Sequence, residues 1–107
     1  MRFAVQRTPR PDGLCVAVAG EVDAYSAPEM RAHLLDALRQ HPSLTVDLSA
    51  VTFMDSQGLA ALLSARQEAE SQGGSLRLEG VPRRVLKLLQ LTRLDTMFTI
   101  DSTATPA

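Results

Sequence analysis

Apolar and polar side chains alternate strictly in the stretch LTVDL, residues 44–48. The stretch LRLE, residues 76–79, repeats the pattern, with Arg77 between two leucines. Alternation with period two is typical of a strand with one covered face and one face in water. Strands of a parallel sheet that has helices on both faces are hydrophobic on both sides instead. We therefore predict that the helices of this protein cover a single face of its sheet.

The segments around these two strands predict an α/β chain with the order β-β-α-β-α-β-α-β. Strands are expected around Phe3 and Val5 and at residues 14–20, 44–48, 76–79 and 97–100, with a turn at residues 11–13. Helices are expected from Ser26 to Pro42, from Asp55 or Ser56 to Gly73, and from Pro82 onward. Right-handed crossovers that all return to one face place the parallel strands in consecutive order. The predicted fold is a β-α superhelix with a mixed sheet of about five strands and an N-terminal hairpin.

The first two predicted helices carry sequence signals for their first turns. Residues 26–29, Ser-Ala-Pro-Glu, fit a capping box, in which Ser26 accepts a hydrogen bond from a backbone N–H and Glu29 reaches back. The second helix can be capped by Asp55 or by Ser56. We expect the loop before the first helix to share one surface with Ser56, because it follows a strand that neighbours the strand before Ser56.

Length and composition predict one soluble domain. The chain has 107 residues and a net charge of −1, so we expect a single domain over residues 1–101, a frayed tail at residues 102–107, and no nucleic-acid partner. No stretch is apolar enough for membrane insertion or for a secretory signal, and the lone Cys15 agrees with a reducing compartment. We expect a cytoplasmic protein.

The sequence offers no cofactor or metal site. Its glycines form no phosphate-binding loop, and a sheet whose strands run in consecutive order has no switch-point crevice for a nucleotide. His33 and His41 share one predicted helix, and no further ligand is spaced to complete a metal set with them. Cofactor, metal and catalytic residues are accordingly all expected to be absent.

Ser56 is the residue whose position suggests chemistry, because it stands at a strand-to-helix junction. A serine hydrolase would need a base beside it, and His41 should lie on the order of 20 Å away at the far end of the first helix. The position two before Ser56 is Met54, where a nucleophile elbow has glycine. A small serine hydrolase is therefore a distant alternative.

Three passages of the chain carry a resemblance to a known family. They are residues 20–23, Gly-Glu-Val-Asp, with 26–28, Ser-Ala-Pro; residues 47–49, Asp-Leu-Ser, with 53–59, Phe-Met-Asp-Ser-Gln-Gly-Leu; and the late run from Leu76 to Phe98. Together they resemble the STAS-domain anti-sigma factor antagonists of bacteria over nearly the whole chain. The fold of that family is a β-α superhelix, in agreement with the one-sided sheet.

The resemblance implies a partner switch in place of an enzyme. An unphosphorylated antagonist binds an anti-sigma factor and frees a sigma factor; the anti-sigma factor is also a serine kinase that phosphorylates the antagonist, and a serine phosphatase reverses the modification. The implied phosphorylation site is Ser56, and Gln57 stands where many relatives have a second serine. A phosphate on Ser56 would be expected to meet partially positive backbone N–H groups at the helix start.

The same resemblance implies a partner-binding surface. We expect it to contain Asp23, Ser26, Asp55, Ser56, Gln57, Gly58 and Leu59. The isolated chain is expected to be monomeric. The main alternative is a STAS subunit of another assembly, such as a stressosome scaffold or a lipid-transport accessory protein.

Overall fold

A computed structural model of the chain describes residues 3–101, and the tail predicted at residues 102–107 lies outside this range. In order, the elements are β1 (Ala4–Arg10), β2 (Gly13–Val22), α1 (Ala27–Gln40), β3 (Ser43–Met54), α2 (Ser56–Ser71), β4 (Ser75–Glu79), α3 (Arg83–Leu91) and β5 (Thr99–Asp101). The predicted element order is confirmed.

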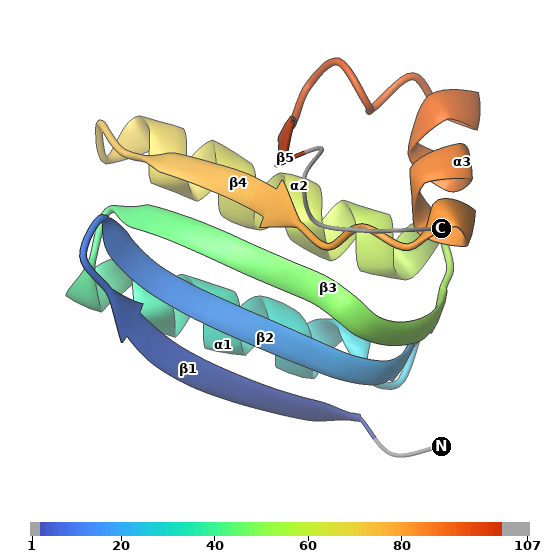
Figure 1. Cartoon of the computed structure of the whole chain (residues 1–107), viewed down its shortest axis with the longest axis horizontal. Helices are drawn as coiled ribbons and strands as arrows, with labels where there is room; N and C mark the ends of the chain where they lie inside the picture. The colour runs from blue at the N-terminus through green and yellow to red at the C-terminus, as the bar shows by residue number, and fades with distance from the viewer. Residues whose placement is uncertain (1–2, 102–107) are drawn as a thin grey trace.

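The strands form one mixed sheet in the order β1-β2-β3-β4-β5. β1 pairs antiparallel with β2 as the predicted hairpin, and each later strand pairs parallel with the one before it. Helices α1 and α2 lie side by side behind the sheet in Figure 1, and α3 packs beside the end of β3. The mixed sheet with consecutive strand order is therefore also confirmed.

The core lies between the sheet and its helices. Val46 and Leu48 of β3 and Leu78 of β4 are fully buried, as are Leu34 of α1 and Leu62 of α2. The three strand residues belong to the alternating stretches that predicted a covered face. Burial of such side chains is the main stabilising term for a domain of this size.

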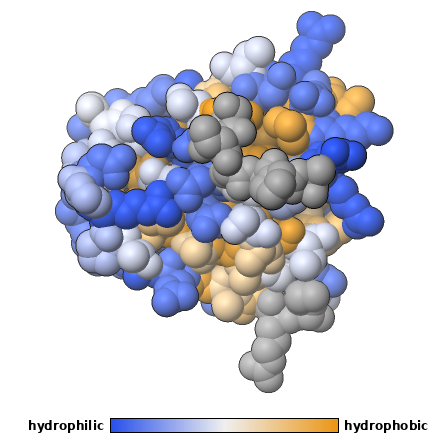
Figure 2. Space-filling model, viewed as in Figure 1, coloured by the Kyte–Doolittle hydropathy of each residue, from blue (hydrophilic) through white to orange (hydrophobic). Residues whose placement is uncertain are grey.

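The face of the sheet opposite α1 and α2 carries polar side chains, and some of its residues are nevertheless buried. Arg10 on β1 and Glu79 on β4 form two hydrogen bonds of 2.9 Å on this face, and Cys15 and Thr45 on the intervening strands are buried. Burial raises the pKa of the Cys15 thiol. Figure 2 views this face, where blue hydrophilic side chains gather on the left and right, with a pale-orange area at the lower centre and deeper orange at the upper right.

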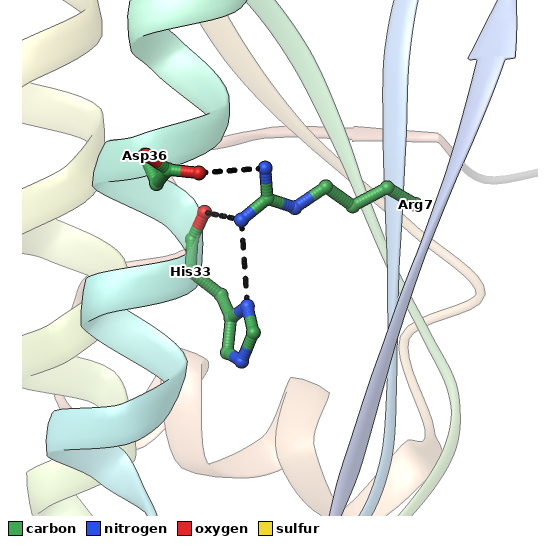
Figure 3. Close-up of polar contacts among 3 residues, drawn as sticks. All are labelled: Arg7, His33 and Asp36. Carbon is green, nitrogen blue, oxygen red and sulfur yellow. Dashed lines mark hydrogen bonds and ion pairs between the residues drawn. The ribbon is translucent and has the colours of Figure 1, made fainter.

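The edge strand β1 is tied to α1 by Arg7 (Figure 3). Its guanidinium donates to an Asp36 carboxylate oxygen at 2.8 Å and to the His33 carbonyl oxygen at 3.4 Å, and it lies 3.4 Å from His33 Nδ1. Arg7 therefore holds the hairpin against the helix layer from the covered side.

β3 is longer than predicted, because it runs on from Leu48 to Met54. The pairing of β2 with β3 shifts register between Ala17 and Ala19 and again between Gly20 and Glu21. Each shift places an extra residue in β3, and a bulge of this kind interrupts the alternation of faces. The alternation of apolar and polar residues that predicts β3 is therefore lost in the second half of the strand.

Candidate functional site

The strands β2 and β3 end side by side and place two loops next to each other. Val22 and Met54, their last residues, are register partners, and the Asp55 N–H donates to the Val22 carbonyl oxygen at 3.2 Å. Residues 23–26 therefore leave the sheet beside residues 55–58, as predicted. We call these two segments the two-loop surface.

The β3–α2 loop is organised by Asp55. Its carboxylate Oδ1 accepts from the Gln57 N–H at 2.9 Å and from the Gly58 N–H at 3.3 Å. Asp55 is thus the N-cap of α2, and Ser56 is the first residue of the helix. Of the two predicted caps, the structure selects Asp55.

The β2–α1 loop is organised by Asp23 and Ser26. The Asp23 carboxylate accepts from the backbone N–H groups of Tyr25 at 2.9 Å and Ser26 at 3.2 Å, and these bonds, that from Ser26 first, lower the pKa of Asp23. The Ser26 hydroxyl donates to the Glu21 carbonyl oxygen at 2.7 Å and accepts from the Asp23 N–H at 2.9 Å.

The predicted capping box is wrong. Ser26 stands at the N-cap of α1, but its side chain makes no capping hydrogen bond. Its hydroxyl is already used by Glu21 and Asp23, which precede it in the chain. The Ser26 hydroxyl therefore forms hydrogen bonds with the backbone before it in place of a capping bond to a helix N–H.

Ser56 is exposed at the helix start. Within residues 3–101 its hydroxyl has no hydrogen-bond partner. Asp55 accepts from the N–H groups of Gln57 and Gly58, so two of the backbone donors at the start of α2 already have a side-chain partner.

Three of the predicted site residues lie inside the molecule. Ser26, Gly58 and Leu59 are buried, and Leu59 is part of the hydrophobic core. A Cβ at Gly58 would come within 2.6 Å of Met54 Cγ and 2.9 Å of Val22 Cγ1. Glycine here allows α2 to start directly against the ends of β2 and β3.

Gln57 is exposed and lines a shallow groove between the first turns of α1 and α2. The groove has a volume of about 220 Å³, and Ala27, Pro28, Ala60 and Arg31 are among its other lining residues. Gln57 directly follows Ser56 in the chain, so one residue of the two-loop surface lines this depression.

Tyr25 is not among the site residues predicted from the sequence. This side chain is 94% exposed in the middle of the β2–α1 loop. Exposed aromatic side chains are enriched in protein interfaces. An aromatic residue between Asp23 and Ser26, in a segment with no other large apolar side chain, was the available signal.

The two histidines lie away from Ser56. His41 follows α1, and its Nδ1 accepts from the Ser43 N–H at the start of β3; His33 contacts Arg7. In the part of the chain that the structure describes, no three His, Cys, Asp or Glu side chains are placed to hold a metal ion. No helix within residues 3–101 is both long and apolar enough to span a membrane.

The family model described as "Mlab, STAS domain" matches residues 5–100. The chain belongs to the STAS-domain family. Among curated STAS relatives, the anti-sigma-B factor antagonist of Bacillus subtilis (strain 168) is 37% identical over 87 residues, which cover 81% of this chain and 80% of that protein.

Solved STAS structures have the same fold. An anti-sigma factor antagonist from Mycobacterium paratuberculosis superposes with a TM-score of 0.78 at 26% identity, covering 94% of this chain and 86% of that one. The Bacillus cell fate determinant SpoIIAA in its phosphorylated form superposes with a TM-score of 0.70 at 20% identity, covering 94% of this chain and 92% of that one.

Proposed function

We propose that this STAS domain is an anti-sigma factor antagonist whose two-loop surface binds an anti-sigma factor and thereby frees a sigma factor. The same anti-sigma factor acts as a serine kinase, phosphorylates Ser56 and ends the interaction; a serine phosphatase restores it. All of these steps belong to the cytoplasm. The observation that carries the proposal is the exposed Ser56 hydroxyl, which has no partner within residues 3–101.

Accessibility supports Ser56 as the phosphorylated residue. A kinase must reach the hydroxyl without first breaking its hydrogen bonds, and Ser56 meets this requirement. Ser26, the other serine of the two-loop surface, is 9% exposed and bonded to Glu21 and Asp23. Phosphorylation of Ser26 would require the loop to open.

Charge supports the switch. A phosphate adds about −1.5 to −2 charges, and a like-charge pair about 4 Å apart near a protein surface costs about 4 kcal/mol. That free energy corresponds to a roughly thousandfold loss of affinity. Asp55 is adjacent to Ser56 and already negative, so phosphorylation concentrates charge at one point of the surface without any need to refold the domain.

Burial divides the predicted binding residues into two groups. Exposed Ser56 and Gln57 and the partly exposed carboxylates Asp23 and Asp55 can be touched by a partner. We add Tyr25 to this group because of its exposure. The buried residues Ser26, Gly58 and Leu59 act by holding the loops in place.

The proposal includes no catalytic residue, cofactor or metal for this chain, which we expect to be a monomer when isolated. The second candidate is a STAS subunit of another assembly, and the description of the matched family model, which differs from the names of the curated relatives, is the observation in its favour. The two candidates differ in the partner.

A binding experiment separates the candidates. The unphosphorylated chain is titrated calorimetrically with the purified anti-sigma factor kinase of the same organism, before and after incubation with ATP. We expect tight binding before incubation and loss of binding afterwards, with Ser56→Ala binding in both conditions. No binding by the unphosphorylated chain would refute the proposal.

A further inference from the structure

A second recess lies on the other side of the Ser56 loop. It has a volume of about 410 Å³ between the end of β3 and the first turns of α3, and its apolar lining includes Val51, Met54, Val85 and Leu88. Phe53 also lines it and is 45% exposed. We call this recess the β3–α3 hollow.

The helix beside the hollow is strongly basic. Arg83 and Arg84 line the hollow, and Lys87 follows one turn later on the same side of α3. α3 contains no acidic residue, and none of these three cations has an ion-pair partner within residues 3–101. The overall charge of −1 therefore conceals a local positive patch.

The placement of the two arginines is unfavourable for the helix itself. The first turn of a helix is stabilised by acidic side chains and destabilised by cations, because the helix dipole is positive there. Arg83 and Arg84 are the first two residues of α3. The two arginines therefore do not serve to stabilise α3, whereas an acidic partner beside them would interact favourably with their charge.

We propose that the β3–α3 hollow receives an apolar side chain from an acidic segment of the anti-sigma factor. The inference rests on the proposed function and extends its contact surface from the Ser56 loop to α3. Phe53 and Met54 line the hollow and directly precede Asp55 and Ser56, so one partner can cover both regions. Charge complementarity selects an acidic segment, and the apolar lining selects an inserted side chain.

A concave hollow favours a protein over a membrane. Proteins that lie on membranes insert their own apolar side chains into the lipid. Here the apolar residues line a recess, and of these Val51, Met54 and Val85 are buried. An anionic lipid surface is the competing occupant that the experiment must exclude.

The test removes the two charges with little change in side-chain size. Calorimetric titration of the unphosphorylated chain with the purified cognate anti-sigma factor compares wild type, Arg83→Gln/Arg84→Gln and the control Arg39→Gln, at low and high salt. Arg39 is an exposed cation on α1 with no ion-pair partner among the described residues. We expect the double variant to raise Kd about tenfold at low salt and to make Kd less dependent on salt concentration. The control should leave Kd and its salt dependence unchanged.

A second pair of variants tests the apolar part. Phe53→Ala is expected to raise Kd about tenfold without flattening the salt dependence, whereas Met97→Ala, a change at another exposed apolar residue, should leave Kd unchanged. Circular dichroism melts confirm that each variant is folded before titration.

The outcomes separate the two proposals. If the double variant and Phe53→Ala both bind like wild type while Ser56 phosphorylation still ends binding, the hollow is not part of the interface and the proposed function stands. If wild type fails to bind the anti-sigma factor, both proposals fall. Binding to phosphatidylglycerol vesicles that the double variant loses, with an unchanged Kd for the anti-sigma factor, would assign the arginines to a membrane and overturn the inference.

Discussion

The two loops of the two-loop surface begin in the same way and end differently. In each, an aspartate directly after a strand accepts hydrogen bonds from the backbone N–H groups two and three residues later: Asp23 from Tyr25 and Ser26, and Asp55 from Gln57 and Gly58. In the first loop the serine is buried and bonded to its own loop. In the second, the helix begins at once and the serine is exposed.

The difference shows how position decides what a serine can do. Ser26 comes three residues after its aspartate, where the chain turns inward and the hydroxyl meets Glu21 and Asp23. Ser56 comes one residue after Asp55, at the first position of α2, where its side chain is exposed. One serine therefore makes hydrogen bonds that hold its loop, and the other has an exposed hydroxyl.

The largest expected effect on stability separates the two serines. Ser26→Ala should lower the free energy of unfolding by about 1–3 kcal/mol, because the Glu21 carbonyl and the Asp23 N–H lose a buried partner. Ser56→Ala, at an exposed position, should change it by less than about 0.5 kcal/mol. Urea unfolding of both variants measures this, and equal losses would contradict the comparison.

A slightly smaller effect is expected at Gly58. Overpacking costs about 1–3 kcal/mol, and the better helix propensity of alanine returns about 1 kcal/mol, so Gly58→Ala should destabilise by up to about 2 kcal/mol. The clash involves Met54 Cγ. In a Met54→Ala background the penalty should therefore shrink, and a full penalty there would show that the contact with Met54 is not its cause.

The cap of α2 comes next. Asp55→Ala removes the acceptor for the Gln57 and Gly58 N–H groups and should cost about 1 kcal/mol. Gln57→Ala, a change at an exposed residue two positions after Asp55, serves as the control and should leave the free energy of unfolding nearly unchanged. A neutral Asp55→Ala in thermal or urea unfolding would mean that Ser56 or solvent replaces the cap.

The smallest effect is a pH dependence at Asp23. Its pKa is lowered in the folded protein by the N–H groups of Ser26 and Tyr25, so ionised Asp23 stabilises the fold. This contribution is complete above the unfolded pKa of about 3.9 and is lost as pH falls through the lower folded value. The difference in unfolding free energy between wild type and Asp23→Asn should shrink below about pH 4. A difference that stays constant down to pH 2.5 would contradict the assignment.

The fold was predictable where local patterns matched the final structure. The alternation in residues 44–48 and 76–79 predicted the covered face and, through crossover handedness, the strand order that the structure confirms. The second half of β3 was not predictable in this way, because two register shifts interrupt the alternation before Met54. The sequence of one strand does not predict a bulge that depends on its pairing with the neighbouring strand.

The site was predictable in position and less so in detail. The motif around Ser56 predicted a helix start, and the structure confirms it. The capping box failed because Ser26 bonds to Glu21 and Asp23, and this choice is set by the path of the loop after β2. Burial of Gly58 and Leu59 follows likewise from packing against the strand ends. The exposure of Tyr25 depends on the same loop path.

We propose that phosphorylation of exposed Ser56 ends binding to the anti-sigma factor. The most direct measurement is phosphopeptide mapping after incubation with the cognate kinase and ATP, followed by titration of the phosphorylated and unmodified chains with that kinase. We expect one phosphate, on Ser56, and a loss of affinity that can reach about a thousandfold, the equivalent of about 4 kcal/mol. A phosphate on Ser49, Thr52 or Ser64 in place of Ser56, or equal affinity of the two forms, would contradict it.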